Sequence, residues 1–206
     1  MLLIKIQTTV VGFCKTVSPV FYRAGGFFLL CSLSVFLCTA SFATAGYEED
    51  IILAASQDDA EAQYALALLY EYGSEVIARD KHKSLQLLQQ SAQKQIAGAC
   101  LYMGLKYEHG NGVSQDFQKA VCYYRCAARQ DWPMAQFFLA DLYFRGKGVE
   151  KSISKALAWL GLAREHGYPG ADSEFLKLQK QSGMNDFKAL KEMQGKLMFK
   201  ITSPCD

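Results

Sequence analysis

Histidine is scarce in this sequence, and the motifs of common enzyme sites are missing from it. The three histidines are His82, His109 and His166, and no two of them have the spacing of a metal-ligand motif. The sequence contains no G-x-S-x-G nucleophile motif, and no Cys/His pair has a readable catalytic spacing. We therefore expect no catalytic site, no metal and no cofactor, and we interpret the histidines as surface residues of helices.

Acidic residues are absent from the first 45 positions. Lys5, Lys15 and Arg23 are the charged residues of that segment, and the first acid is Glu48. Subtracting these three cations from the 22 basic residues leaves 19, against 20 acidic residues. A nearly neutral body gives no electrostatic basis for binding nucleic acid, so we expect no such partner.

The apolar run near the N-terminus is too short for a typical membrane span. It extends from Phe27 to Ala40, which is 14 residues, whereas a spanning helix needs about 20. Basic residues precede the run and the small residues of 43–45 follow it, which is the order of a secretory signal peptide. We predict cleavage after Ala45 and a periplasmic or secreted protein. The alternative is an uncleaved inner-membrane anchor with the body facing the periplasm, which would be the protein's one contact with a membrane.

The rest of the chain contains an internal repeat. YEHGNGVSQDFQKA (107–120) is followed 36 residues later by YFRGKGVEKSISKA (143–156). Three residue types recur at steps of 36 or 37 residues, namely Ala62, Ala99, Ala135 and Ala171; Tyr70, Tyr107 and Tyr143; and Lys83, Lys119 and Lys155. Repeats of this length indicate supersecondary units that stack on one another.

Each repeat has two stretches of helical periodicity with a turn between them. In the second repeat, Ala99, Met103 and Tyr107 lie on one helical stripe, and the apolar residues of 117–128 lie on another. One helical hairpin cannot bury its apolar face alone, so we predict an all-α solenoid, a right-handed superhelix of helix–turn–helix repeats. Three small residues are expected where helices approach closely: Ala67, Gly104 and Ala140.

The repeated phrase between the helices carries turn and capping chemistry. Gly110 and Gly146 follow the last apolar residue of a first helix, where a left-handed conformation often ends a helix. Asp80, Asp116 and Ser152 each precede an aligned lysine by three residues and are good N-caps for the second helices.

The pattern A-x-x-x-L-G-x-x-Y-x-x-G-x-G-V-x-x-D-x-x-K-A resembles the SEL-one-like repeat, a short relative of the tetratricopeptide repeat. The stretch 99–120 fits it with Met103 in the leucine position, 135–156 fits it with Ala140 for glycine, and 62–85 is degenerate. The resemblance implies an adaptor scaffold that binds other proteins and has no catalytic site. Bacterial members of the family are often exported.

These observations divide the chain into four parts. They are a signal peptide or anchor (1–45), a lead-in (46–58), three repeats in 59–170 (59–95, 96–131 and 132–167), and a C-terminal part (171–206) with a partial fourth unit. The C-terminal part also contains the apolar periodicity of 184–199, which predicts an amphipathic capping helix for the solenoid.

Four cysteines, Cys100, Cys122, Cys126 and Cys205, lie beyond the predicted leader. Cys100 opens the first helix of the second repeat and Cys126 lies near the end of the second helix, so antiparallel packing would allow a disulfide between them. Buried thiols are the alternative, and Cys205 is a candidate for pairing between molecules. Exported cysteine-rich relatives pair a cysteine at the position of Cys100 with one eight residues earlier, which here is Ala92.

A binding groove is expected on the side lined by the first helices. Counted from each aligned alanine, the residues at −1, +2, +6, +9 and +10 should face it. The candidates for partner contact are Tyr64, Glu71, Tyr72, Leu101, Leu105, Glu108, His109, Phe137, Asp141, Phe144 and Arg145. Aromatic and aliphatic residues mixed with charges are typical of a protein or peptide site. The alternative is that Leu101, Leu105 and Phe137 pack against the next first helix.

The sequence therefore predicts an exported, non-catalytic adaptor that binds a protein or peptide partner through its concave face in the bacterial envelope. One alternative is an envelope hydrolase acting on cell-wall or lactam substrates. Glu71 and Glu108, one repeat apart, resemble a carboxylate pair for acid–base work, but we interpret them as solvated groove residues. A second alternative is a signal-anchored protein that recruits a partner to the membrane.

Overall fold

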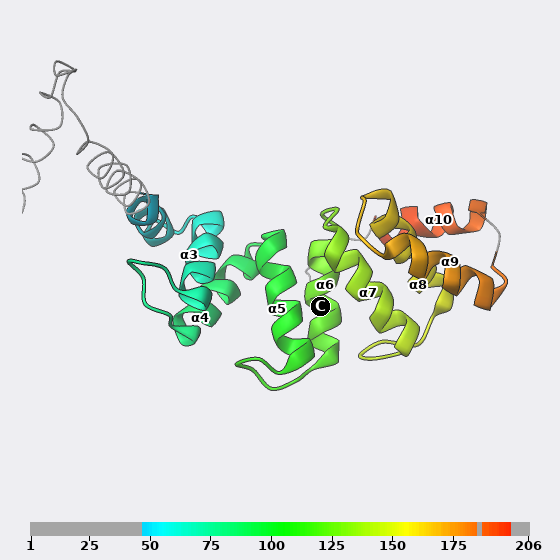
Figure 1. Cartoon of the computed structure of the whole chain (residues 1–206), viewed down its shortest axis with the longest axis horizontal. Coiled ribbons are helices and arrows are strands. Elements are labelled where there is room, and N and C mark those ends of the chain that lie inside the picture. The colour runs from blue at the N-terminus through cyan, green and yellow to red at the C-terminus, as the bar shows by residue number, and fades with distance from the viewer. Residues whose placement is uncertain (1–46, 185–186, 199–206) are drawn as a thin grey trace, which may run out of the picture. The chain divides into compact units, whose positions relative to one another are not determined.

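Successive helices pack against one another along the chain (Figure 1). The computed structural model describes residues 47–184 and 187–198, and within these ranges the regular structure is helical. A helix at 47–56 precedes α3 (Ala60–Tyr72), α4 (Lys81–Gln93), α5 (Ala97–His109), α6 (Phe117–Ala128), α7 (Pro133–Arg145), α8 (Ile153–Glu165), α9 (Ala171–Ser182) and α10 (Phe187–Met198). The predicted all-α solenoid is confirmed. The predicted signal peptide and Cys205 lie outside the described residues.

The predicted capping residues begin the second helix of each repeat. Asp80 Oδ1 accepts from the backbone N–H groups of the second and third residues after it, at 3.0 and 3.1 Å, and Asp116 does the same at 2.9 and 3.0 Å. Ser152 Oγ accepts from the N–H of Lys155 at 3.3 Å. Each such cap satisfies backbone donors that the helix itself leaves unpaired.

The turn glycines are required by backbone geometry and by crowding. Gly110 and Gly146 end α5 and α7 in the left-handed conformation, with φ of 72° and 68°. Gly148 has φ of 69°, and a Cβ placed on it would lie 2.3 Å from the carbonyl of Phe117 in the preceding repeat. The turn of the third repeat therefore touches the start of α6, which no larger residue would permit.

The tyrosines and lysines that repeat through the sequence contact one another. In each repeat the lysine of the second helix lies over the tyrosine ring of the first, with Nζ to ring centroid distances of 5.2 Å (Lys83 and Tyr70), 5.1 Å (Lys119 and Tyr107) and 5.4 Å (Lys155 and Tyr143). A cation over an aromatic face contributes about 0.5–1 kcal/mol at an exposed site. This contact explains why tyrosine and lysine recur at equivalent positions of the three repeats.

A continuous core runs through the stacked helices. It is densest around α8, where the stretch 156–163 is buried without interruption because α7, α9 and α10 all pack against this helix. A separate, smaller cluster lies at the N-terminal side, where Ile51 and Ala55 of the 47–56 helix meet Leu66 and Ile77. The first repeat thus has the thinner core.

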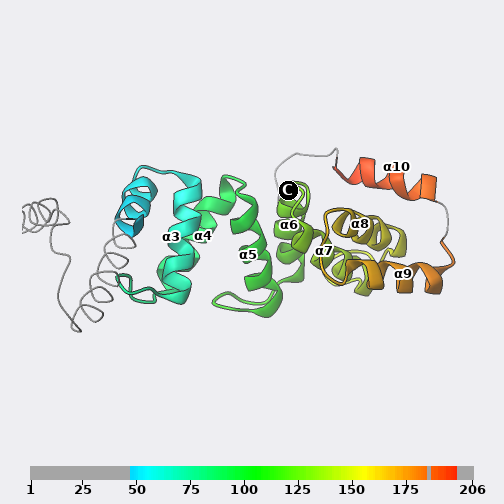
Figure 2. The ribbon, with the colours of Figure 1, turned by 45° about the horizontal axis from the view of Figure 1, so that its top comes forward.

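The last helix folds back onto α8. Leu190 is buried there, and Gln194 Nε2 donates to the carbonyl of Ala158 at 3.2 Å. At the other end of α10, Arg129 Nε donates to the carbonyl of Leu197 at 3.2 Å, so α10 also reaches α6. In Figure 2, α8 lies between α9 and α10.

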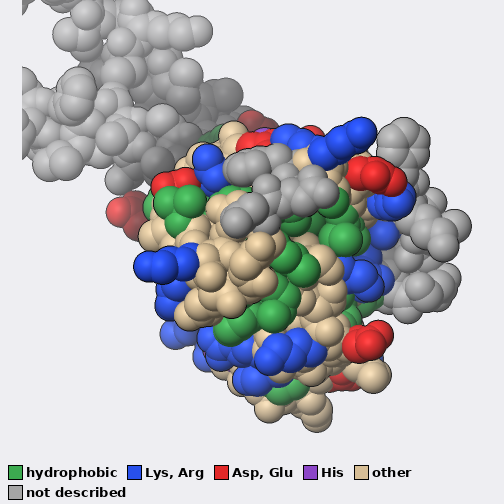
Figure 3. Space-filling model, turned by 90° about the vertical axis from the view of Figure 1, so that its right-hand side faces the viewer, with side chains coloured by type: hydrophobic (Ala, Val, Ile, Leu, Met, Phe, Trp, Pro, Cys, Tyr) green, Lys and Arg blue, Asp and Glu red, His purple; other side chains and the backbone are tan. Residues whose placement is uncertain are grey.

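The end of the molecule that carries α9 and α10 in Figure 1 has a mixed surface. Figure 3 shows apolar side chains interspersed with Lys and Arg on this end, and acidic side chains at its margins. Leu176 of α9 is 52% exposed. A terminal unit with polar residues around its apolar ones is what a solenoid needs at its end.

Candidate functional site

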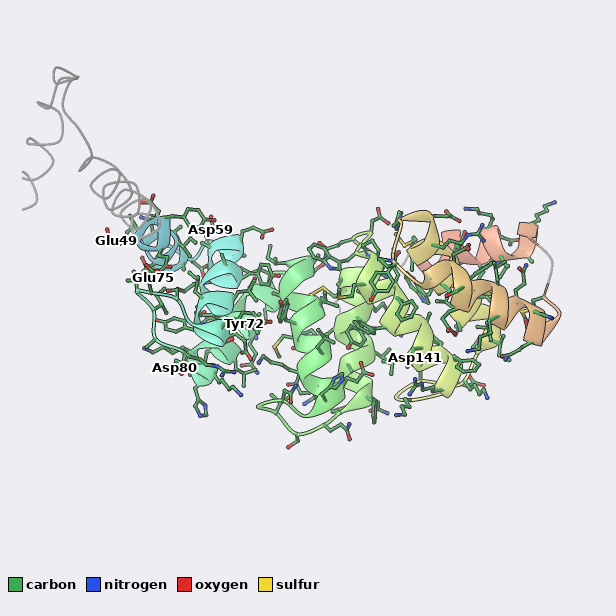
Figure 4. The ribbon with its side chains drawn as sticks, in the orientation of Figure 1. Glu49, Asp59, Tyr72, Glu75, Asp80 and Asp141 are labelled. Carbon is green, nitrogen blue, oxygen red and sulfur yellow. A yellow bond between two sulfur atoms is a disulfide. The ribbon has the colours of Figure 1, made fainter. Side chains whose placement is uncertain are left out.

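Two hollows lie on the side of the structure formed by the first helices. The aromatic hollow, with a cavity volume of about 800 Å³, lies between α5, α7 and α9. The cationic hollow, of about 540 Å³, lies between the first hairpin and α5. Both are lined by His109 of α5, so the two hollows adjoin. Figure 4 shows two of their lining residues, Tyr72 at the end of α3 and Asp141 on α7.

The aromatic hollow has three phenylalanines of α7 in its lining. Phe137 packs against Tyr168 with ring centroids 4.8 Å apart, and Phe138 packs against Tyr124 of α6 at 5.5 Å. Phe144 is 38% exposed, near the open side. Rings that neighbouring side chains already hold in place offer contact area with little further loss of conformational entropy on binding.

The charged residues at the edge of the aromatic hollow pair with one another. Arg145 Nε lies 2.8 Å from Asp141 Oδ1, one helical turn earlier on α7. On α9, Lys177 Nζ lies 3.5 Å from Glu174 Oε2. These pairs account for the two cations Arg145 and Lys177, while the remaining acid, Glu108, is hydrogen-bonded to a tyrosine hydroxyl. The phenylalanines of the lining favour an apolar group.

Glu108 is held by a buried tyrosine. The Tyr124 hydroxyl donates to Glu108 Oε2 at 2.6 Å, and burial together with this hydrogen bond raises the pKa of Tyr124. The ring fits because Gly104 has no side chain, since a Cβ there would lie 2.5 Å from a Tyr124 ring carbon. Gly104 was predicted to be a close-contact residue, and this contact confirms it.

Glu71 joins the first repeat to the second at the cationic hollow. Lys106 Nζ of α5 donates to Glu71 Oε2 at 2.8 Å, and Ser84 Oγ of α4 donates to the same oxygen at 2.9 Å. The side chains of Lys106 and Glu71 are 9% and 17% exposed. Burial raises the pKa of Glu71, but the hydrogen bonds from Lys106 and Ser84 together with nearby positive charge outweigh it, so the pKa is below its usual value.

Three tyrosines meet beside the cationic hollow. The hydroxyl oxygens of Tyr72 and Tyr102 lie 3.4 Å apart, and the rings of Tyr64 and Tyr102 have centroids 6.0 Å apart. The hydrogen bond with Tyr72 and, to a smaller extent, burial raise the pKa of Tyr102. Tyr72 itself is 67% exposed, so it presents a ring and a hydroxyl to solvent.

The structure brings most of the predicted groove residues into the two hollows. The residues that line one or both are Glu71, Tyr72, Leu105, Glu108, His109, Phe137, Asp141, Phe144 and Arg145. Two expected positions differ. Leu101 is 4% exposed and belongs to the core, because it packs between helices. Tyr64 lines neither hollow and instead covers Gly98, where a Cβ would lie 2.5 Å from its ring.

Several lining residues were missed by counting positions along three repeats. Tyr102, Phe138 and Glu174 lie three residues after their aligned alanines, on the helix face next to the predicted one. Lys177 and Gln181 occupy positions +6 and +10 counted from Ala171 in α9. The same rule would have found these two if it had been applied to the fourth aligned alanine.

The acids of the groove are engaged in hydrogen bonds. Glu71 accepts from Lys106 and Ser84, and Glu108 accepts from Tyr124, so both line the hollows as half-buried, hydrogen-bonded residues. Within residues 47–184 and 187–198, no group of three or more His, Cys, Asp and Glu side chains could hold a metal ion.

A disulfide joins the two helices of the second repeat. Cys100 of α5 and Cys126 of α6 are bonded, with their Cα atoms 6.0 Å apart. Both are buried, and Cys122 on α6 is not a free thiol either. The bond holds α5 and α6 together at the repeat that contributes to both hollows.

No helix of the described residues is long and apolar enough to cross a membrane. This finding concerns residues 47–184 and 187–198 alone, and the short apolar run of the predicted leader lies outside them.

Comparison with known proteins supports the fold. The crystal structure of a Sel1 repeat protein from Oxalobacter formigenes is similar, with a TM-score of 0.60 and 26% identity, over 63% of this chain and 96% of that one. A protective antigen of uropathogenic Escherichia coli strains, which displays an SLR fold, has a TM-score of 0.62 and 27% identity over 73% of this chain. The match covers 32% of the antigen, so this chain corresponds to about a third of its length.

The repeats also match a family model. No curated protein sequence matches the chain. The model of the Sel1 repeat matches residues 60–95, 97–132 and 133–168, together just over half of the chain. Its three matches coincide with the hairpins α3–α4, α5–α6 and α7–α8. The chain therefore belongs to the Sel1 repeat family.

Proposed function

We propose that this protein is an exported, non-catalytic scaffold that binds a protein or peptide partner through the two adjoining hollows. Sel1 repeat proteins commonly mediate protein–protein interactions. The observation that carries the proposal is the aromatic hollow, in which phenylalanine rings of one helix line an open cavity of about 800 Å³. Its size and apolar lining suit side chains of a partner.

The mechanism is the presentation of side chains by a rigid stack. Phe137 and Phe138 are fixed by their ring neighbours, and Arg145 by its ion pair with Asp141. Aromatic residues and arginine are the usual anchors of interfaces. Because these groups are ordered before binding, association costs less conformational entropy than it would on a flexible surface.

Three observations support export to the periplasm or beyond. Residues 1–45 have the order of a signal peptide, and the disulfide of the second repeat suits an oxidising compartment. One structural relative is described as a protective antigen present in uropathogenic Escherichia coli strains. The mass of the mature protein tests this part, because cleavage after Ala45 leaves a chain that begins at Gly46. An intact N-terminus in a membrane fraction would favour the anchored alternative.

The binding proposal is tested by affinity capture from an envelope extract of the source cell. We expect a protein that the wild-type chain retains and that Phe144→Ala releases, because Phe144 is an exposed ring at the aromatic hollow. Leu176→Ala is the matched control, since Leu176 is more exposed and lines neither hollow. Equal loss with both variants, or retention by Phe144→Ala, would contradict the proposed site.

An envelope hydrolase is not our proposal. Acid–base chemistry on a substrate needs carboxyl groups that are free to exchange protons with it, whereas Glu71 and Glu108 are each bound by neighbouring side chains. Hydrolysis of cell-wall or lactam substrates by the purified chain, with a pH–rate profile that rises above the uncatalysed background, would contradict this view.

A further inference from the structure

The cationic hollow contains more positive charge than its own acids balance. Arg79, Lys81 and Lys106 line it together with a single carboxylate, Glu71, which is already bound by Lys106. Asp80 lies beside Lys81 in the chain, but one of its oxygens caps α4 and the other lies 3.8 Å from Lys83. Glu71 also interacts with the charge of Lys81, so one carboxylate is shared among the three cations of the hollow, which leaves a surplus of positive charge.

The structural role of Arg79 does not need its charge. Arg79 Nε donates to the carbonyl of Glu71 at 2.8 Å, which ties the loop to the end of α3. The second repeat makes the same contact with a neutral side chain, because Gln115 Nε2 donates to the carbonyl of Glu108 at 2.7 Å. The positive charge of Arg79 is thus additional to what the turn requires.

Lys81 departs from its repeat, whereas the position of Arg79 is also basic in the third repeat, where it is Lys151. Lys81 is the first residue of α4, and the equivalent residues of the other two repeats are the apolar Phe117 and Ile153, which pack against the core. A cation at a helix N-terminus is unfavourable, since that end of the helix dipole is positive. Lys81 is nonetheless exposed at the hollow, so the stability of α4 gives no reason for its charge.

The adjoining aromatic hollow has the opposite character. Its Arg145 and Lys177 are paired with Asp141 and Glu174, and its lining is rich in phenylalanine. Two neighbouring hollows, one rich in phenylalanine and one with more cations than acids, would distinguish the two parts of a bound chain.

We propose that the ligand is an extended peptide segment that places a carboxylate, from an Asp or Glu side chain, in the cationic hollow and an apolar side chain in the aromatic hollow. Arg79 and Lys81 are the contacts for the carboxylate, with the exposed hydroxyl of Tyr72 beside them. The inference rests on the proposed function and adds the chemistry of the partner and its direction along the groove, with the acid toward the first repeat.

The test selects peptides from a phage-displayed library of short random sequences on the purified full chain. We expect enriched peptides that combine Asp or Glu with Phe, Leu or Trp a few residues away. The same selection on Lys81→Gln should lose the acidic preference. Lys180→Gln is the matched control, because Lys180 is an exposed lysine of α9 that lines neither hollow.

A double-mutant cycle then locates the contact. An enriched peptide should bind Lys81→Gln about tenfold more weakly than it binds the wild type. The Asp→Asn or Glu→Gln version of the peptide should show the same loss of affinity for the wild type. The two changes together should cost little more than either alone, because they remove the same interaction. Thermal unfolding of Lys81→Gln should be unchanged or higher, so that weak binding cannot be attributed to misfolding.

The outcomes separate this inference from the proposed function. The inference would be overturned if the enriched peptides lacked acids. It would also be overturned if they bound Lys81→Gln as tightly as the wild type but bound Phe144→Ala more weakly. Either result would leave the proposed function standing. A chain that enriches no peptide also overturns the inference, and the capture experiment with Phe144→Ala then decides the proposed function on its own.

Discussion

Gly112 and Gly148 occupy the same place in successive repeats but meet different surroundings. Both have positive φ, 80° and 69°, yet a Cβ on Gly112 would meet nothing within 4 Å, whereas one on Gly148 would lie 2.3 Å from the Phe117 carbonyl. We expect Gly112→Ala to lower the free energy of unfolding by about 1 kcal/mol through backbone strain. Gly148→Ala should cost about 2 kcal/mol more, because the repeats must move apart.

Urea unfolding of the two variants measures this difference. Each is the control for the other, since the substitution and the backbone conformation are shared and the neighbouring repeat differs. Equal losses of stability would show that the Gly148 turn can move away from α6 without cost.

The ion pair of Glu71 makes stability depend on pH. The pKa of Glu71 is below its usual value because the hydrogen bonds from Lys106 and Ser84 outweigh burial. Its carboxylate therefore stabilises the fold above the unfolded pKa of about 4.3, and this contribution is lost as the pH falls through the lower folded pKa. We expect Glu71→Gln to lower the free energy of unfolding by about 1–2 kcal/mol at neutral pH.

The difference between wild type and Glu71→Gln should shrink as the pH falls below about 5, because protonated Glu71 resembles glutamine. Urea titrations across this range provide the measurement. A difference that stays constant with pH would mean that Glu71 contributes through packing and that its ionisation does not matter.

At the scale of the helices, the disulfide constrains one hairpin. Cys100 and Cys126 are 26 residues apart, and closing a loop of that length in the unfolded chain is worth about 3 kcal/mol on the chain-entropy model. We expect Cys100→Ala combined with Cys126→Ala to lower the free energy of unfolding by roughly this amount, as measured by urea unfolding. An unchanged unfolding midpoint would argue that the two cysteines are not bonded in the purified protein.

The helices and their ends were predictable from the sequence because their causes are local. Caps such as Asp116 and turn residues such as Gly146 act on neighbours only a few residues away, and the repeat supplied three examples of each. The C-terminal helix was predictable from its own periodicity. That it would fold back onto α8 was not, because this depends on the room beside Gly161, where a Cβ would lie 2.6 Å from Gln194.

The candidate site was less predictable, because contacts with other helices decide how a helix is rotated about its axis. A rotation by one residue changes which side chains face the groove. Leu101 and Tyr102 are adjacent, and a small rotation decides which one is buried; the structure buries Leu101 and leaves Tyr102 at the cationic hollow. The charge of Lys81 could have been suspected, since its counterparts Phe117 and Ile153 are uncharged. The bonding of Glu71 to Lys106 needed the geometry of two repeats.

At the scale of the whole described body, stability should be uneven along the stack. The first hairpin contributes to a small separate cluster, whereas α8 is buried by three neighbouring helices. In a linear array, each unit is stabilised mainly by its neighbours. We expect amide hydrogens of α3 and of the 47–56 helix to exchange before those of α7 and α8, as measured by hydrogen exchange with mass spectrometry.

A second exchange measurement on Ile51→Ala supplies the control for this prediction. The substitution removes a side chain of the N-terminal cluster, so exchange should become faster in α3 and remain unchanged in α8. Faster exchange along the entire body would show instead that the repeats unfold as a single cooperative unit.

The position of the disulfide also determines how the chain responds to a pulling force. Cys100 and Cys126 belong to the same repeat, so the bond between them does not hold neighbouring repeats together. Under tension the repeats could come apart one after another, yet the loop between the two cysteines would stay closed. The fully stretched chain would then be shorter by about 80 Å than the reduced chain, which makes the redox state of its surroundings a determinant of how far this protein can extend.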